Sequence, residues 1–350
     1  MVFSSYFNKI PYVIMWYIAK HRKRLINCVA YCAEPLDYFI LAPVINYLDR
    51  PCVFVAKNRE TANFLKKRGY SPLKMPVFPE TVLMARHSAW KFPVKSIHRF
   101  GFRHGPYHFK TFTSPKNYHA FTLFFLTSPT EEKEAREVGI KNGVAIGYPK
   151  LDPAFDGTWT QSEGTRESPL EIFRRKTFPN NHNPILLFSA TWDKSGMSAI
   201  NLWYHRLTEL THDFKVCVTL HPWMSKKIYD TIQKMSDVYL VSQDNLLPVM
   251  LLADLTISDT SSIIGEFIAL DKRIITFKSH EAPRKPKELE DILQKAGYGV
   301  ETFEELKKVL LTYLSGDDPY QESRRELRDM MFCNLGTAGK KAAEIINKYL

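Results

Sequence analysis

The sequence contains no long uninterrupted apolar segment near its start. The apolar run IPYVIMWYIA at residues 10–19 has ten residues, whereas a helix that spans a membrane needs about 20. We therefore expect no transmembrane helix here. The basic residues KHRKR follow this run, and no small-residue cleavage site comes after them. For this reason a cleaved signal peptide is not expected either.

Cysteines and spaced metal ligands are also scarce. The five cysteines are odd in number, form no CxxC pair and lie mostly in apolar, strand-like contexts: Cys28, Cys32, Cys52, Cys217 and Cys333. This predicts a reduced, cytosolic protein without a zinc site. Cys28 and Cys32, four residues apart, leave open a weaker alternative, a pair at helical spacing. No carboxylates are spaced as metal ligands, so we predict no bound metal and no other cofactor.

Acidic residues are rare in the N-terminal part of the chain. The first 33 residues contain none, and residues 1–128 hold 19 Lys and Arg against 5 Asp and Glu, a net charge of +14. Residues 129–350 hold 29 Lys and Arg against 32 Asp and Glu, a net charge of −3. We expect the basic N-terminal part, residues 1–128, to face an anionic partner, which can be a membrane surface, a polyphosphate or nucleic acid.

The segment 1–24 favours the membrane surface. Tyr12, Trp16 and Tyr17 lie next to a basic cluster that runs from Lys20 to Arg24, a combination typical of helices in the headgroup region. We predict an amphipathic membrane-surface segment, and hence a cytoplasmic protein that is peripheral on the inner face of the membrane. A helix that docks on the protein core is the alternative, because its apolar stripe has the same composition.

The rest of the chain alternates strand-like and helix-like runs. With 350 residues and 45% hydrophobic content, it can form two domain cores. Repeated βα units predict an α/β protein with parallel sheets. A polar stretch at 156–183 is the best boundary, so we expect a Rossmann-like domain at 25–160, a linker, and a second Rossmann-like domain at 184–350. The two are expected to face each other across a cleft.

A polar turn between two apolar runs is the first candidate site. In LLADLTISDTSSIIGEFIALDKRIITF, the residues Asp259, Thr260, Ser261 and Ser262 follow a predicted strand and precede a predicted helix. Free N–H groups and hydroxyls at such a turn suit a phosphate. Glu266, one helical turn later, is placed to accept hydrogen bonds from a ribose. An ordinary helix N-cap is the alternative.

Two histidines lie at the ends of other predicted strands. His104 precedes Gly105, where the backbone can turn tightly, and His221 precedes Pro222, which cannot continue strand pairing. Either imidazole can act as a base or a phosphate ligand near neutral pH, and either can equally be a solvated surface residue.

Several motifs occur together in a recognisable order. They are HG at 104–105, TSPTEEKE from 127, GYPKLD from 147, SATW from 189, LHP at 220–222, the DTSS segment and the final NLGTAGKKAAEII. This set resembles the CDP-glycerol glycerophosphotransferase family of teichoic-acid primases and polymerases, over about residues 95–350.

The resemblance implies a GT-B fold and a transfer of glycerol phosphate, or a related polyol phosphate, from a CDP-activated donor. The resemblance also implies that the acceptor is a hydroxyl of a membrane-borne glycan or teichoic-acid-like chain and that CMP is released. It implies that His104 is the general base, that His221 contacts donor phosphate, and that nucleic acid is not a partner. The implied donor-site residues are Gly105, Asp259, Thr260, Ser261, Ser262, Glu266 and Arg273.

The sequence departs from the family pattern at some of these motifs. ATWD at 190–193 replaces PTWR and loses a positive charge, Thr260 replaces a tyrosine, and RIITF replaces RPIIF. Single transfer and polymerisation therefore both remain open. Two other hypotheses are a GT-B glycosyltransferase that uses a nucleotide sugar and a non-catalytic binder of lipid or nucleic acid.

Overall fold

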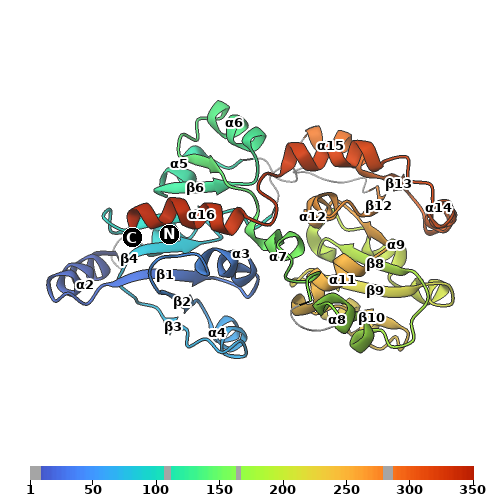
Figure 1. The fold of residues 1–350 in the computed structure, drawn as a ribbon, viewed down its shortest axis with the longest axis horizontal. Coiled ribbons are helices and arrows are strands. Elements are labelled where there is room, and N and C mark those ends of the chain that lie inside the picture. The colour runs from blue at the N-terminus through green and yellow to red at the C-terminus, as the bar shows by residue number, and fades with distance from the viewer. Residues whose placement is uncertain (1–8, 106–111, 163–166, 279–286) are drawn as a thin grey trace. The chain divides into compact units, whose positions relative to one another are not determined.

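The computed structural model describes residues 9–105, 112–162, 167–278 and 287–350. The chain divides into two compact units, each built on one parallel sheet (Figure 1). Unit 1 comprises Met1–His104, Phe112–Pro153 and Phe332–Leu350, and unit 2 comprises Gly105–Thr111 and Ala154–Met331. The predicted α/β class with parallel sheets is confirmed.

The seven-stranded sheet of unit 1 has the order β3-β2-β1-β4-β5-β6-β7, and all its neighbouring strands are parallel. The strands are β1 (Ile26–Cys32), β2 (Cys52–Ala56), β3 (Leu73–Lys74), β4 (Pro79–Met84), β5 (His98–Phe102), β6 (Leu123–Leu126) and β7 (Gly143–Ala145). The central strands are apolar and buried, as expected for parallel strands covered on both faces. The strand order reverses between β1 and β4, which makes this pair the switch point of the sheet.

Helices and 3₁₀ turns surround this sheet. They are α2 (Lys9–His21), α3 (Leu36–Ile45), α4 (Arg59–Lys66), η1 (Ala89–Lys91), α5 (Pro115–His119), α6 (Pro129–Glu137), η3 (Pro149–Leu151), α16 (Ala338–Ile346) and η7 (Asn347–Tyr349). The short α7 (Asp152–Phe155) lies at the boundary of the two units. Ser128 caps α6 by accepting a hydrogen bond from the Glu131 amide at 3.2 Å, as its position before the helix predicts.

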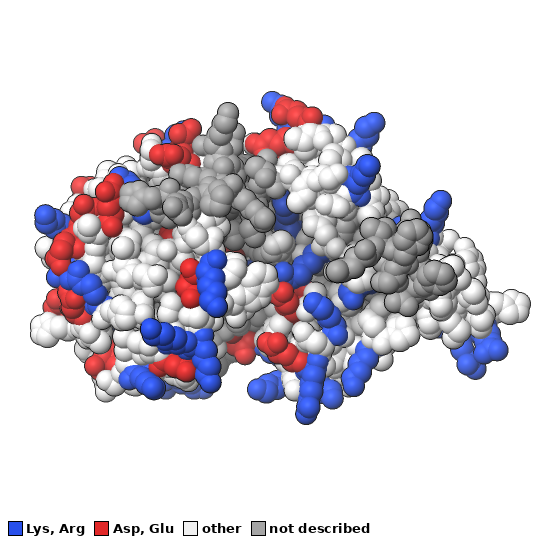
Figure 2. Space-filling model, turned by 180° about the vertical axis from the view of Figure 1, so that it is seen from behind, with Lys and Arg blue, Asp and Glu red and all other residues white. Residues whose placement is uncertain are grey.

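Helix α2 both docks on the core and keeps an apolar outer face. Trp16 is 2% exposed, and its indole N–H donates to the Pro79 carbonyl at 2.7 Å. The Tyr12 hydroxyl donates to the Val77 carbonyl at 2.7 Å. The outward residues include Ile14 and Ile18, which are 54% and 38% exposed. On the face in Figure 2, the end of unit 1 that carries α2 shows Lys and Arg and no acidic side chain.

The six-stranded sheet of unit 2 has the order β10-β9-β8-β11-β12-β13 and is also parallel throughout. Its strands are β8 (Ile185–Ala190), β9 (Lys215–Leu220), β10 (Val238–Leu240), β11 (Leu255–Ser258), β12 (Arg273–Phe277) and β13 (Tyr298–Val300). Its switch point lies between β8 and β11. The core on one face centres on Phe188, Trp203 and Ile257, all fully buried.

The helices of unit 2 connect and cover these strands. They are α8 (Pro169–Thr177), η4 (Asp193–Ser195), α9 (Ile200–Trp203), η5 (Leu207–Leu210), α10 (Lys226–Gln233), η6 (Gln243–Asn245), α11 (Leu246–Leu252), α12 (Ile263–Ala269), α13 (Lys287–Ala296), α14 (Phe303–Leu314) and α15 (Gln321–Met331). Helix α8 lies inside the predicted linker 156–183 and begins with a capping box formed by Ser168 and Glu171.

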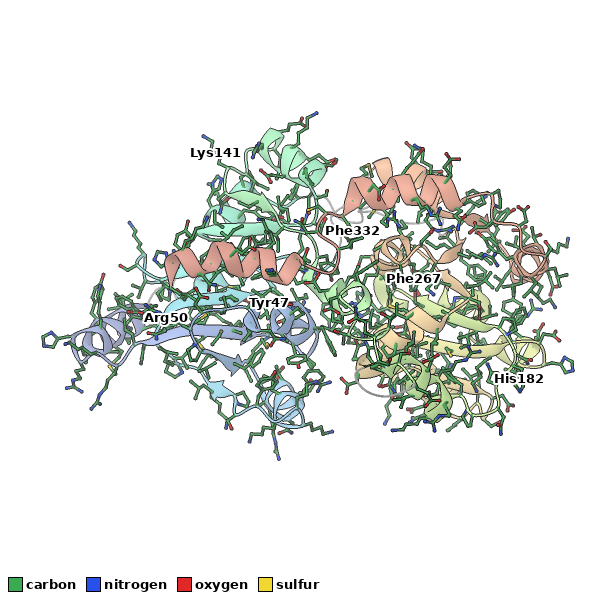
Figure 3. The ribbon with its side chains drawn as sticks, in the orientation of Figure 1. Tyr47, Arg50, Lys141, His182, Phe267 and Phe332 are labelled. Atoms are coloured by element: carbon green, nitrogen blue, oxygen red, sulfur yellow. The ribbon has the colours of Figure 1, made fainter. Side chains whose placement is uncertain are left out.

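The C-terminal segment returns to unit 1, although the sequence assigned 184–350 to the second domain. Phe332, labelled in Figure 3, begins this segment and is buried. The next amide, of Cys333, donates to the Thr127 carbonyl at 3.0 Å. The buried carboxylate of Asp152 accepts from the amides of Ala338 and Gly339 at 3.1 and 2.6 Å and so caps α16. The final motif therefore completes unit 1.

The cysteines lie on strands or in the C-terminal segment. Cys28 and Cys32 belong to β1, and Cys28 is in register with Cys52 on β2. The alternative of a cysteine pair on a helix is therefore wrong. In the described part of the chain, no group of three or more His, Cys, Asp or Glu is arranged to hold a metal ion. No helix among these residues is long and apolar enough to cross a membrane.

Candidate functional site

The best candidate site in unit 2 is the carboxyl edge of its sheet at the switch point. Parallel α/β sheets bind ligands outside the carboxyl ends of their strands at this position. Thr191 follows β8, Asp259 follows β11, and His221 follows the neighbouring strand β9. Just below this edge, Ser189 and Ser258 form a buried hydrogen bond of 2.8 Å between their hydroxyls.

Asp259 connects the loops at this edge. Its carboxylate is fully buried and accepts from the Thr191 amide at 2.9 Å and from the Thr191 hydroxyl at 2.9 Å. It also accepts from the amides of Ala199 and Ser261, at 3.2 and 3.0 Å. The sequence interpretation placed Asp259 among the ligand-binding residues. The carboxylate oxygens of Asp259 are buried and accept these hydrogen bonds, so in this structure the residue holds two loops in place.

Burial also changes the acidity of Asp259. Loss of hydration raises the pKa of its carboxyl from the ordinary 3.8 to about 6, and hydrogen bonds from Thr191, Ala199 and Ser261 only partly oppose this rise. The group is therefore mostly ionised at pH 7, as its hydrogen-bond donors require.

The hydroxyls of Ser261 and Ser262 are not used to cap α12. Ser262 is the N-cap residue, yet its side chain makes no capping hydrogen bond. Both serines are partly exposed, and no hydrogen bond of either hydroxyl occurs among the described residues. Gly105, which groups with unit 2, is close by, because a Cβ added to it would lie 3.2 Å from Ser262 Oγ. The alternative of an ordinary N-cap would require a side-chain hydrogen bond from Ser262 to the start of α12, and this bond is not formed.

Two further predicted residues lie on the same element or next to it. Thr260 is partly exposed, and its hydroxyl makes a long contact of 3.5 Å with the Met197 carbonyl in the loop after β8. Glu266 lies on α12 one turn after Ser262 and is 5% exposed. The Glu266 side chain is therefore largely enclosed by protein in this structure.

His221 lies in an aromatic cluster beside these loops. Its Nδ1 accepts a hydrogen bond from the Trp223 amide at 3.1 Å, which leaves the proton of the neutral ring on Nε2. The Trp223 ring is 62% exposed and lies 5.7 Å from Trp192, edge to face. Asp193 accepts from the Ser225 amide at 3.0 Å and joins the two loops. Sequence reasoning missed this tie, because residues 32 apart in sequence form it.

In unit 1, His104 follows the carboxyl end of β5 and is exposed. The preceding residue, Arg103, donates through Nε to the fully buried Glu131 at 2.6 Å. Glu131 also accepts from the Thr127 amide at 2.6 Å. The TSPTEEKE motif therefore anchors the strand end from which His104 projects.

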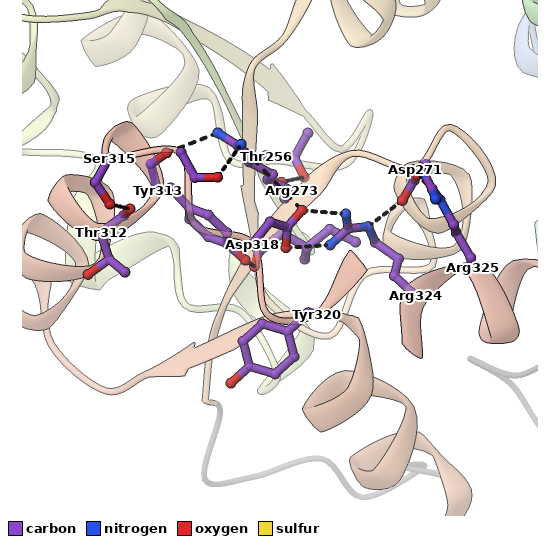
Figure 4. Close-up of polar contacts among 12 residues, drawn as sticks. Thr256, Asp271, Arg273, Thr312, Tyr313, Ser315, Asp318, Tyr320, Arg324 and Arg325 are labelled. Carbon is purple, nitrogen blue, oxygen red and sulfur yellow. Dashed lines mark hydrogen bonds and ion pairs between the residues drawn. The ribbon is translucent and has the colours of Figure 1, made fainter. Parts of the chain in front are cut away.

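Arg273 does not lie at the carboxyl edge of its sheet. It is the first residue of β12, in register with Leu255 at the start of β11. Its guanidinium donates to the carbonyls of Tyr313 and Gly316 at 2.9 and 3.3 Å and lies 3.8 Å from Asp318 (Figure 4). The donor contact of Arg273 stays a prediction, and in this structure its guanidinium is bound at the opposite strand end.

Comparison with known proteins identifies the family. A family model described as CDP-glycerol:poly(glycerophosphate) glycerophosphotransferase matches residues 103–348. The chain belongs to this family. The match includes His104, His221 and the loop that carries Ser261, and it confirms the resemblance that the ordered motifs indicated.

Relatives of this glycerophosphotransferase family member agree with the assignment. The teichoic acid ribitol-phosphate polymerase TarL of Staphylococcus aureus is 25% identical over 212 residues, which cover 57% of this chain and 35% of TarL. The matched part is thus about a third of that relative. The wall teichoic acid polymerase TagF has a TM-score of 0.64 at 14% identity, with 97% of each chain covered.

A UDP-GlcNAc 2-epimerase from Neisseria meningitidis also has a TM-score of 0.64 at 14% identity, with 92% of this chain and 100% of the epimerase covered. These structures share the fold, and the predicted GT-B class is confirmed.

We predict that ionisation of Asp259 lowers stability between pH 4 and 6. The unfolded carboxyl ionises near 3.8 and the folded one near 6, so the unfolded chain releases its proton first as the pH rises. The Asp259→Asn variant does not titrate there. The unfolding free energy of the wild type relative to this variant should fall by about 3 kcal/mol over this window and stay constant above it. Denaturant unfolding of both proteins at several pH values measures this difference in unfolding free energy. A difference that rises with pH instead of falling would contradict the prediction.

Proposed function

We propose that the protein transfers a polyol phosphate, glycerol phosphate in the first instance, from a CDP-activated donor to a hydroxyl of a membrane-borne acceptor. The observation that carries the proposal is the carboxyl edge of unit 2, where the Ser261 and Ser262 hydroxyls make no capping bond next to loops fixed by Asp259. Family membership supports CDP-glycerol as the donor. The acceptor and the release of CMP belong to the proposal.

The chemistry assigns one task to each histidine. The acceptor oxygen attacks the β-phosphorus of the donor, the bond from that phosphorus to the bridging oxygen breaks, and CMP leaves with the bond electrons. His104 takes the proton of the attacking hydroxyl. His221, with its proton on Nε2, donates to the pyrophosphate, and Ser261 and Ser262 donate to the same group. Glu266 is proposed as the ribose contact.

The serine assignment predicts a loss of affinity without a loss of stability. Replacing Ser261 and Ser262 with Ala should weaken CDP-glycerol binding by about 1–3 kcal/mol, because hydrogen bonds to a charged group are lost. The melting temperature should stay close to that of the wild type, since Ser262 makes no capping bond.

Ser168→Ala is the matched control, because Ser168 belongs to a genuine capping box. It should cost about 1 kcal/mol of stability and leave donor affinity unchanged. Calorimetric titration and thermal melting on the same samples separate the two effects. Normal donor affinity in the double variant would remove these serines from the donor site.

The histidine assignments predict different kinetic losses. His104→Ala should bind CDP-glycerol almost normally and turn over about 10²–10⁴-fold more slowly, the usual effect of losing a general base. His221→Ala should lose affinity together with rate, because its interaction exists before the reaction as well.

Donor affinity and single-turnover release of CMP are the two measurements. His212→Ala is the control, because His212 is a highly exposed histidine of unit 2, with a side chain 94% exposed. A panel of CDP-alcohols and of UDP- and GDP-sugars, with release of CMP, UDP or GDP as the readout, distinguishes the polyol-phosphate transferase from a glycosyltransferase. Wild-type turnover by His104→Ala would refute the catalytic assignment.

We also propose that α2 places the protein on an anionic membrane surface. Trp16 and Tyr12 fasten the helix to unit 1, so its outward isoleucines stay available to lipid. The basic residues at 20–24 follow directly and suit anionic headgroups.

The membrane proposal predicts a loss of vesicle binding when the outer face is made polar. Ile14→Ser with Ile18→Ser should weaken binding to anionic vesicles about tenfold or more, because two apolar side chains no longer enter the interface. Stability should change little, because both residues are exposed. Higher salt should weaken wild-type binding. Leu311→Ser with Leu314→Ser on α14 is the control, and equal losses in both pairs would contradict the proposal.

A further inference from the structure

A second group of side chains gathers at the carboxyl edge of unit 1. Tyr31 lies near the end of β1, Lys57 directly follows β2, and Lys91 ends η1, which follows β4 in the chain. The Lys57 amide donates to the Cys32 carbonyl at 3.0 Å, which holds this residue beside the end of β1. β1 and β4 flank the switch point of the sheet, the position at which such folds bind ligands.

Two positive charges meet here without a negative partner. Lys91 Nζ lies 5.7 Å from the centre of the Tyr31 ring. Partial burial and the nearby Lys57 ammonium both lower the pKa of Lys91. Neither lysine forms an ion pair with a described residue. Glu34 and Asp37, which follow β1 in the chain, instead pair with Arg86 at 2.6 and 2.9 Å. An anion would relieve the repulsion.

The Tyr31 hydroxyl adds a buried donor to this group. Tyr31 is 1% exposed, and its hydroxyl has no hydrogen-bond partner among the described residues. Burial, and then the charges of Asp37 and Cys32, raise the pKa of Tyr31 to about 12, so the group remains an O–H donor at neutral pH. A buried hydroxyl without a partner costs free energy, and an oxygen of a bound group would remove that cost.

An exposed aromatic ring lies next to these donors. Trp90 is 64% exposed, and Lys91 Nζ is 4.5 Å from the centre of its ring. Phe92, the next residue, contacts Tyr12 of α2, with 6.5 Å between the ring centres. Lys91 is therefore flanked by an exposed aromatic side chain and lies on a segment that packs against α2. This combination suits a phosphate that is attached to a hydrocarbon.

We propose that Lys57, Lys91 and the Tyr31 hydroxyl bind the phosphate of a lipid phosphate, with its hydrocarbon against Trp90. The inference rests on the proposed function in one respect, namely that the acceptor is borne by the membrane. It goes beyond that function because it assigns the anchoring phosphate of the acceptor to named residues of unit 1.

Calorimetric titration of the full chain with octyl phosphate, below its micelle concentration, tests the site. Saturable 1:1 binding is expected, and Lys57→Gln with Lys91→Gln should weaken it about tenfold or more, because charge-assisted hydrogen bonds are lost. Tyr31→Phe should also weaken binding while leaving the melting temperature unchanged or raised, since the lost hydroxyl has no partner. A merely structural tyrosine would not give this combination.

Lys66→Gln with Lys67→Gln is the matched control, because it removes the same charge from the exposed end of α4 in the same unit. Equal weakening by both pairs would reduce the effect to overall charge and overturn the site. Inorganic phosphate and octyl glucoside complete the comparison. If inorganic phosphate binds as tightly as octyl phosphate, the ligand is a free phosphate, and if octyl glucoside does, the patch is merely apolar. Either result overturns the lipid-phosphate assignment.

The test is independent of turnover. Octyl phosphate binding is measured without a CDP donor, whereas the proposed function is judged by CMP release. Binding that depends on Lys57 and Lys91, together with no CMP release from any CDP-alcohol, would support this site and refute the transferase. The reverse outcome, CMP release without this binding, would refute the site alone.

Discussion

A buried carboxylate, Asp259, connects the two strands on either side of the switch point in unit 2. Its oxygens accept hydrogen bonds from the residue that follows β8, from Ala199 at the end of the same loop, and from Ser261. Three backbone amides are thereby directed at one side chain. Because a parallel sheet does not itself determine the path of its strand-end loops, this carboxylate is what holds the candidate phosphate loop against the loop after β8. The cost of burying the charge appears as the raised pKa.

Much of the secondary structure was predictable, because it depends on local patterns. Buried parallel strands appear as short apolar runs, and β1, β8 and β11 coincide with such runs. β4 is less evident in the sequence, because Pro79, Glu80 and Thr81 open it. Ser128 precedes an acidic first turn, a local pattern typical of a capped helix start, and it caps α6. The ordered motifs indicated the family, and the family model confirmed it.

Other features were not predictable, because they depend on contacts between residues far apart in the chain. Ser168 opens a helix in a stretch that looked like a linker, since its polar composition hid a capping box. Residues 332–350 return to unit 1 because Asp152 caps α16 from 186 residues away in sequence. Arg273, which the resemblance places among the donor-site residues, donates in this structure to two backbone carbonyls at the opposite strand end. Side-chain type alone does not show to which edge of a sheet a residue belongs.

The same edge also shows how a charge change in the motif is accommodated. The acid at position 193, where the family pattern has arginine, binds the Ser225 amide and thus holds the start of α10. Helix α10 begins with Lys226 and Lys227, both exposed, so positive charge remains on the joined loops. A lysine is a mobile point charge and does not match two phosphate oxygens as an arginine fork does. Under the proposed function, selectivity for the donor therefore depends on the fixed groups, which are His221 and the hydroxyls of Ser261 and Ser262.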